Sequence, residues 1–171
     1  MELEIFFESI WFMLPAYAAT IVPFYARKIN FLNYPINKKL FGQNKTYRGL
    51  FFGIAWAIFI AYLQVELYTK YFVVKALSIV LYDRINYFLF GFLLGFGALF
   101  GDLVKSFFKR RLNIKEGKSW FPFDNIDYAI GALAFVSFVY VPPIEHIIIV
   151  VILSGLLHFL FENIWLALKW R

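Results

Sequence analysis

The chain contains no cysteine and only two histidines among its 171 residues. The lack of cysteine excludes a disulfide framework, a thiolate metal site and a thiol nucleophile. Neither a Ser-His-Asp arrangement nor an H-E-x-x-H motif is visible in the sequence. The candidates that remain for chemistry are carboxylates and cations.

The N-terminus lacks the positive charge of a cleavable signal peptide. It reads MELEIFFESI and is acidic, whereas a signal peptide begins with a basic region. The first apolar stretch is therefore expected to remain as a membrane helix. Hydrophobic residues make up 62% of the chain, against roughly 45–50% in a soluble domain. This excess favours a membrane protein and leaves no room for a separate soluble domain.

Long apolar runs predict an all-α, polytopic integral membrane protein, with one transmembrane catalytic domain over residues 1–171. A spanning helix needs about 20 mostly apolar residues. About five transmembrane helices are expected, at 5–26, 49–64, 87–103, 127–141 and 144–168. The fourth is long enough only if Asp124 lies in its first turn. The run at 71–82 is short and contains Lys75, which favours an interfacial or re-entrant helix over a sixth span.

Lysine and arginine are concentrated in two of the four predicted loops, the first and the third. These cations are Arg27, Lys28, Lys38, Lys39, Lys45 and Arg48, and then Lys109, Arg110, Arg111, Lys115 and Lys118. By the positive-inside rule, the two basic loops, the active site and the C-terminus are expected in the cytoplasm and the N-terminus outside. This topology of a multi-pass cell-membrane protein explains the net charge of +6, so no nucleic-acid partner is expected.

Three aspartates border the second basic loop: Asp102 near the end of one span, and Asp124 and Asp127 at the start of the next. Asp124 and Asp127 are three residues apart and share one face of a helix. Mg²⁺ takes one or two carboxylates together with substrate phosphate oxygens. We therefore predict that the three aspartates are catalytic and hold Mg²⁺. The alternative is a helix-capping role for Asp124 and Asp127.

Basic and polar residues accompany these acids. Asp102, Lys105, Ser106 and Lys109 recur at the spacing of one helix face, where the alternative is an ion pair at the membrane interface. In the first loop, FGQNKTYRG at 41–49 resembles a phosphate cradle, although it is not a P-loop. We predict phosphate contacts for Asn44, Lys45 and Arg48. Lys38 and Lys39 are expected to contribute only to the orientation of the chain in the membrane. Spacing and composition thus favour a nucleotidyltransferase that acts on a lipid phosphate.

The segment from Ser106 to Asp127 resembles the signature of CDP-diacylglycerol synthases: Ser-Phe-Phe-Lys-Arg-x4-Lys-Glu, then Phe-Pro and Asp-x-x-Asp. The chain departs from that signature in three places. Glu116 stands where the family has Asp, the His-Gly-Gly segment is missing, and Asn125 stands where Arg is usual. These departures, the small size, and GDLVKSFFKRR at 101–111 are more similar to the archaeal relatives, the CDP-archaeol synthases.

This resemblance covers nearly the whole chain. It implies a Mg²⁺-dependent cytidylyl transfer from CTP to an unsaturated archaeal ether-lipid phosphate, which gives CDP-archaeol and pyrophosphate for phospholipid biosynthesis. Lys105 and Lys109 would join the catalytic set, and the substrate-binding set would be Asn44, Lys45, Arg48, Ser106, Arg110, Lys115 and Lys118. Alternatives are a CDP-diacylglycerol synthase, a CTP-dependent lipid kinase, or, in a different class, a small ion or solute transporter.

The lipid is expected to enter sideways from the cytoplasmic leaflet, because CTP cannot enter hydrocarbon and the lipid chains cannot enter water. Gly91, Gly95, Gly97 and Gly101 lie in the third predicted span. Their spacing favours close helix packing. The alternative is that these glycines leave a groove for a branched lipid chain.

Overall fold

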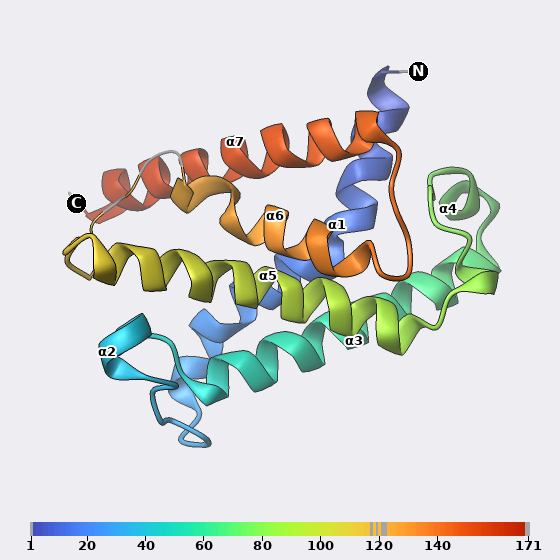
Figure 1. Ribbon diagram of the computed structural model, residues 1–171. Coiled ribbons are helices and arrows are strands. Elements are labelled where there is room, and N and C mark those ends of the chain that lie inside the picture. Colours follow the sequence, from blue (N-terminus) through green and yellow to red (C-terminus); the bar gives the residue numbers. More distant parts are fainter. Residues whose placement is uncertain (1, 117, 119, 121–122, 170–171) are drawn as a thin grey trace.

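The computed structural model describes residues 2–116, 118, 120 and 123–169; the side chains of 2 and 158–169 lie outside the description. The elements follow the order α1, η1, α2, α3, α4, η2, α5, α6, α7. The described residues form helices joined by turns and loops, with no strand; Pro35 and Thr46 form an isolated bridge. The all-α fold is therefore confirmed (Figure 1).

Three long helices form the frame of the molecule: α1 (Glu2–Tyr25), α3 (Tyr47–Lys70) and α5 (Tyr87–Arg111). Each has 24 or 25 residues, which is about 36 Å at 1.5 Å per residue and exceeds the roughly 30 Å of bilayer hydrocarbon. By length and composition all three are able to cross a membrane. Exposed aromatic side chains such as Trp56, Phe59 and Phe88 suit a surface that faces lipid.

The remaining two helices of the bundle are α6 (Phe123–Val136) and α7 (Ile144–Lys169). Helix α6 has 14 residues, or about 21 Å, and is shorter than the bilayer is thick. Asp124 lies in its first turn, as the sequence requires for this segment. Helix α7 has 26 residues. The count of five spans stays a prediction, since α6 alone is too short to cross.

The segment after α3 does not form a sixth span. It contains only α4 (Phe72–Ala76) and the 3₁₀ turn η2 (Tyr82–Arg84). Phe72 and Val73 are largely exposed, whereas Val80 and Tyr82 are buried against the core. In Figure 1 this segment lies at the opposite end of the bundle from α2 (Lys38–Phe41). These two ends are called the α4 end and the α2 end below.

Glycines allow α5 to approach its two neighbours closely. A Cβ built on Gly97 would lie 2.5 Å from the Gly131 carbonyl oxygen of α6, and one on Gly101 would clash with the Asp127 carbonyl oxygen. On the other face, a Cβ on Gly91 would lie 2.7 Å from Ile58 Cα of α3. The alternative of a lipid groove along these glycines is therefore wrong, because neighbouring helix backbones fill the space beside them.

Several helix ends differ from the predicted boundaries: α3 continues to Lys70 rather than 64, α6 covers 123–136 rather than 127–141, and two further shifts move basic residues. Lys109, Arg110 and Arg111 form the last turn of α5 rather than part of the following loop, where cations are favoured by the partial negative charge of a helix C-terminus. Arg48 lies in the first turn of α3, one residue after the start. The Thr46 hydroxyl caps that helix by accepting from the Gly49 N–H at 3.2 Å. Both shifts bring basic side chains onto rigid helices at the α2 end.

Candidate functional site

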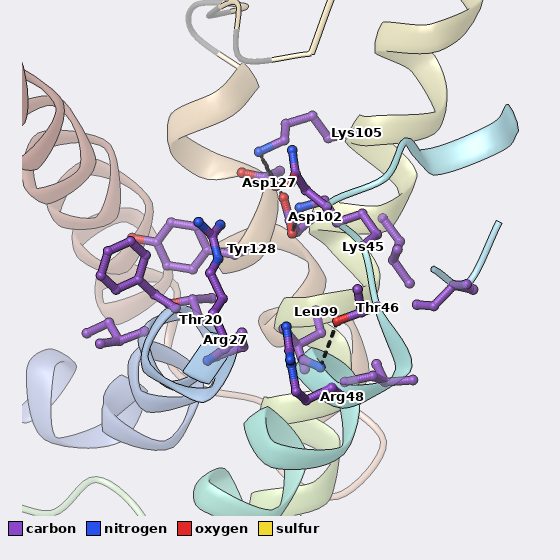
Figure 2. A pocket seen from close by; sticks show the side chains of 18 of the residues that line it. Thr20, Arg27, Lys45, Thr46, Arg48, Leu99, Asp102, Lys105, Asp127 and Tyr128 are labelled. Atoms are coloured by element: carbon purple, nitrogen blue, oxygen red, sulfur yellow. Dashed lines mark hydrogen bonds and ion pairs between the residues drawn. The ribbon is translucent and has the colours of Figure 1, made fainter. Parts of the chain in front are cut away.

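Lys105 lies at the centre of three carboxylates. Its Nζ is 3.1 Å from Asp102 Oδ1, 3.3 Å from Asp124 Oδ1 and 3.0 Å from Asp127 Oδ2. The i, i+3 spacing places Asp102 and Lys105 on one face of α5, and Asp124 and Asp127 on one face of α6. The close packing of these two helices joins the two faces into one cluster. Figure 2 shows Lys105, Asp102 and Asp127 converging at the wall of a pocket.

Asp124 accepts bonds from several directions. Lys109 Nζ lies 3.1 and 2.9 Å from its two carboxylate oxygens, and the Trp120 N–H donates to Asp124 Oδ2 at 2.5 Å. The same Lys109 ammonium donates to the Lys118 carbonyl at 2.5 Å. Lys109 is buried, and it links the end of α5 to the start of α6. The structure thus joins Lys109 to the predicted acids, through contacts that also order the loop.

The first basic loop reaches the same cluster through Lys45. Its Nζ forms an ion pair with Asp102 Oδ2. The loop is held in place by the bridge between Pro35 and Thr46 and by the Ile36 N–H, which donates to the Lys45 carbonyl at 2.8 Å. Three separate parts of the chain therefore contribute charged groups to one site, as the sequence predicts.

The donor types of this cluster are those that a divalent cation prefers, but their spacing in the described residues is not that of a metal site. Asp127 Oδ1 is buried and has no hydrogen-bond partner among the described residues. Carboxylate oxygens are the ligands that Mg²⁺ prefers. Within the described part of the chain, however, no three acidic or histidine side chains are already spaced around a common metal position. The point where the carboxylates converge is taken by the Lys105 ammonium, and three ammonium groups balance three carboxylates.

Glu116 is a functional candidate that sequence reasoning did not place in the site. Its Oε1 accepts from the Gln43 N–H at 2.9 Å, and its Oε2 lies 3.4 Å from Asn44 Nδ2. Gly42 has a φ of +90°, and a Cβ there would meet the Glu116 carboxylate. Glu116 thus fastens the loop that carries Asn44 and Lys45. The signal that marked it was its position beside Lys115 in the motif.

Arg48 is buried and donates from Nη1 to the Ile29 carbonyl at 2.6 Å. This contact ties the start of α3 to the segment that follows α1. The side chain also lines the main cavity. Arg48 therefore has a structural partner in addition to the phosphate contact predicted for it.

The other predicted binding residues are divided between the site and the surface. Ser106 is buried and its hydroxyl donates to the Asp102 carbonyl at 2.8 Å. Ser106 and Arg110 line a smaller cavity of about 160 Å³ beside Lys105 and Lys109. The side chains of Lys115 and Lys118 are exposed, and neither is among the described residues that line the two cavities. Phe121 and Pro122, which belong to the motif, lie outside the described residues.

A cavity of about 870 Å³ opens beside the cluster. Asn44, Lys45, Thr46 and Arg48 line it from the first loop and α3, and the carboxylates line it from α5 and α6. The sequence did not single out the residues contributed by α1, η1, α7 and the middle of α6: Tyr17, Thr20, Ile21, Phe24, Arg27, Tyr128 and Leu157. Only the tertiary packing of these helices brings them to the cavity. It combines charged groups with an apolar side, which suits a phosphate ester attached to hydrocarbon.

Tyr17 and Tyr128 shape the apolar side of this cavity. Their rings are 6.1 Å apart in an edge-to-face arrangement. The Tyr128 hydroxyl donates to the Ser154 carbonyl at 3.2 Å, and the Tyr17 hydroxyl lies 3.3 Å from Ser154 Oγ. Helices α1, α6 and α7 are thereby held together around the cavity.

Comparison with known proteins gives consistent matches along the chain. The family model described as CarS-like, CDP-archaeol synthase, matches residues 2–170. A CDP-archaeol synthase from Methanococcus maripaludis is 36% identical over 161 residues, which cover 92% of this chain and 89% of the relative. One from Thermococcus onnurineus is 33% identical over 181 residues, with coverage of 99% and 100%.

A solved structure is also similar to this fold. It is described as an intramembrane enzyme for archaeal membrane lipid biosynthesis. The TM-score is 0.69 and the sequences are 26% identical, over 92% of this chain and 93% of that chain. The helical arrangement and the intramembrane setting are thus shared with this structure.

Proposed function

This chain belongs to the CDP-archaeol synthase family, and we propose that its reaction takes place where the 870 Å³ cavity meets the Lys105 carboxylate cluster. The protein is a membrane-embedded cytidylyltransferase that uses CTP in archaeal lipid synthesis. The observation that carries the site assignment is that one cavity has both a charged wall and an apolar wall. Its two substrates, CTP and a lipid phosphate, differ in the same way.

The nucleophile in this reaction is the lipid phosphate. One of its oxygens forms a bond to the α-phosphorus of CTP while the bond from that phosphorus to the β-phosphate bridge breaks, and the electron pair leaves with pyrophosphate. A phosphate monoester is already anionic, so no strong general base is required. The task of the protein is to position two anions against each other and to neutralise their charge.

Lys45, Lys105 and Lys109 supply positive charge on the cluster side. Asp102 and Asp124 hold these ammonium groups in place through ion pairs before any substrate binds. Groups positioned in advance stabilise developing charge without reorganisation during the reaction. Lys45 and Lys105 also line the main cavity. These two lysines therefore serve the triphosphate, while Lys109 orders Asp124 and the loop.

Asp102, Asp124 and Asp127 would hold Mg²⁺ in the working enzyme. The buried Asp127 Oδ1 without a hydrogen-bond partner supports this assignment. When bound, the ion neutralises charge on the triphosphate and on the leaving pyrophosphate. The side chains of Asn44, Ser106 and Arg110 complete the polar surface on the nucleotide side, and contacts from the exposed Lys115 and Lys118 stay a prediction.

The α2 end faces the cytoplasm in this proposal, and the N-terminus faces outside. CTP then reaches the cluster from water, and the lipid chains remain in the bilayer beside α1 and α7. The natural chain lacks cysteine, so single Gln43→Cys and Glu145→Cys variants report orientation cleanly. Both positions are exposed. We expect labelling of Gln43→Cys only from the cytoplasmic side; labelling of Glu145→Cys from that side alone would reverse the orientation.

A transfer assay tests the function directly. Purified protein receives CTP labelled in the α-phosphate and Mg²⁺, with unsaturated ether-lipid phosphate and ester-lipid phosphate in parallel reactions. We expect label in the ether lipid at the higher rate, and release of one pyrophosphate per product. A higher rate with the ester lipid would assign the chain to CDP-diacylglycerol synthesis, and label in neither lipid would refute cytidylyl transfer.

A further inference from the structure

The main cavity has two chemically distinct sides. Thr20, Ile21 and Phe24 of α1 and Leu157 of α7 line one side, together with Tyr128. Figure 2 shows Thr20, Arg27 and Tyr128 on this side, and Lys45, Thr46 and Arg48 on the other. Hydrocarbon chains gain by contact with the first side, and CTP by contact with the second. Arg27 is thus a cation on the apolar side.

The cations of this cavity differ in what already binds them. Of the described residues that line it, four are basic: Arg27, Lys45, Arg48 and Lys105. Lys45 is paired with Asp102, Lys105 contacts three carboxylates, and Arg48 donates to the Ile29 carbonyl. The Arg27 guanidinium lies 5.1 Å from the centroid of the Phe24 ring. It has no hydrogen bond or ion pair to any other described residue, so its donors remain available to a ligand.

We propose that Arg27 binds the phosphate group of the lipid substrate and thereby selects a phosphorylated lipid. This inference rests on the proposed function. A lipid phosphate that enters past α1 needs a cation whose donors are not already bound, because Lys45 and Lys105 are paired with carboxylates of the cluster. A guanidinium where the apolar side ends supplies such donors, and its planar fork matches two phosphate oxygens. The third oxygen then remains free to form the bond to the α-phosphorus of CTP.

The position of Arg27 also fixes how deeply the lipid enters. Arg27 lies in η1 (Ala26–Lys28), directly after α1. A phosphate held there leaves the chains alongside Ile21 and Phe24, and keeps the head group at the level of the cluster. Lys28 lies in the same turn and is exposed like Arg27, but it is not among the described residues that line the cavity. These two neighbouring cations form a matched pair for an experiment.

The experiment compares Arg27→Gln, Arg27→Lys and Lys28→Gln in the full-length protein in detergent. The first readout is equilibrium binding of labelled ether-lipid phosphate without CTP, which requires no turnover. We expect Arg27→Gln to weaken binding about tenfold or more, as for loss of hydrogen bonds to a charged group. Arg27→Lys should restore part of the affinity, because it keeps the charge and loses the fork. Lys28→Gln should bind like the wild type, and binding of the matching lipid alcohol should not distinguish the variants.

The second readout separates the two substrates. In the transfer assay, Arg27→Gln should raise the KM for lipid phosphate and leave the KM for CTP within about twofold, since loss of one charged contact affects only its own ligand. Equal weakening by Arg27→Gln and Lys28→Gln would overturn the inference in favour of a general interfacial charge. A rise in the KM for CTP alone would assign Arg27 to the nucleotide. If the wild type bound the lipid phosphate and transferred no label, the proposed function would fail while the binding comparison still decided the role of Arg27.

Discussion

The two ends of the bundle both bury polar side chains, but they use them differently. At the α4 end, Gln64 Nε2 donates to the Trp11 carbonyl at 2.5 Å, and His146 Nε2 lies 2.9 Å from Glu8 Oε2. At the α2 end, Lys105 contacts carboxylates from two helices, and Lys45 reaches one of them from a loop. The first set joins helices in pairs. The second set concentrates charge at the wall of a cavity.

In the proposed function, this difference separates polar groups that serve the reaction from polar groups that serve helix packing. Burying charge costs free energy, so a dense charged cluster at the edge of the membrane is a candidate site for ligands or ions. The single Glu8–His146 pair satisfies a packing role between α1 and α7. The three carboxylates and three ammonium groups of the α2 end instead lie beside a cavity that a ligand can enter. Substitutions at the two ends should therefore have different consequences.

The largest effect is expected from removal of the central cation. Lys105→Met leaves three carboxylates without their shared ammonium group, and should cost about 3–5 kcal/mol of stability, as for breaking a buried ion pair. Thermal unfolding in detergent measures this loss. Added Mg²⁺ should raise the unfolding temperature of the variant more than that of the wild type, because the ion replaces the missing charge.

Lys75→Met at the α4 end is the control for this variant. Lys75 Nζ lies 3.9 Å from Asp83 Oδ2, and both side chains are more than half exposed. Little change in stability is expected there. Equal destabilisation by the two substitutions would contradict the distinction between the ends.

Loss of one carboxylate should nearly abolish turnover. Asp127→Asn keeps the volume of the side chain and removes its charge, and should lower kcat on the order of a hundredfold, as for removal of one preorganised electrostatic group. Glu8→Gln at the α4 end should retain near wild-type kcat. If Asp127→Asn remained fully active at saturating Mg²⁺, this aspartate would not belong to the site.

Helix packing at the α2 end should tolerate no added methyl group. Gly101→Ala places a Cβ against the Asp127 carbonyl oxygen, and should cost about 1–3 kcal/mol of stability through overpacking. Gly155→Ala in α7 is the matched control, because the nearest atom to its Cβ is Ile126 Cγ2 at 3.6 Å. If Gly155→Ala lowered the unfolding temperature more than Gly101→Ala, a groove beside α5 would again be possible.

A smaller effect is expected from loss of the Glu116 carboxylate, which fastens the loop that carries Asn44 and Lys45. Glu116→Gln weakens the bond to the Gln43 N–H and should raise the KM for CTP by about threefold to tenfold, as for loss of roughly one hydrogen bond. Glu145→Gln, exposed in the first turn of α7 at the other end, should leave both KM values unchanged. An unchanged KM for CTP in Glu116→Gln would show that the loop positions Lys45 without the contacts of the Glu116 carboxylate.

The smallest effect is expected from the exposed lysines of α2. Lys38 and Lys39 lie in that short helix at the α2 end, outside the cavities as described. Alanine at either position should change the KM for CTP by less than about twofold, in line with ordinary surface substitutions. A larger rise than that produced by Lys45→Ala would mean that the phosphate cradle lies on α2.

Local spacing was sufficient to predict which charged residues lie together, whereas their role in the reaction stays a prediction. Asp102 with Lys105, and Asp124 with Asp127, lie on common helix faces whatever the tertiary structure, and the charged residues at the membrane edge predicted that the faces meet. The length of the apolar runs was likewise sufficient to predict the helices α1, α3 and α5. Helix α6 is shorter than a span, and its contribution to the count of spans stays a prediction.

Residues that depend on packing between distant segments could not be predicted. Tyr17 and Tyr128 reach the cavity only because α1, α6 and α7 meet at Ser154. Glu116 is an exposed residue whose partner lies 73 positions earlier in the chain. Arg27 was one basic residue among many in its loop, and only the surroundings of its guanidinium distinguish it. In each case the sequence names the residue type but not its neighbour.

The most direct test of the central claim follows two phosphates of CTP into the product. The protein is given ether-lipid phosphate, Mg²⁺ and CTP labelled either in the α-phosphate or in the γ-phosphate, and the extracted lipid is counted. Cytidylyl transfer predicts label in the lipid only from the α-phosphate, with all γ-label recovered in pyrophosphate. Lipid labelled from the γ-phosphate would contradict the account and identify a lipid kinase instead.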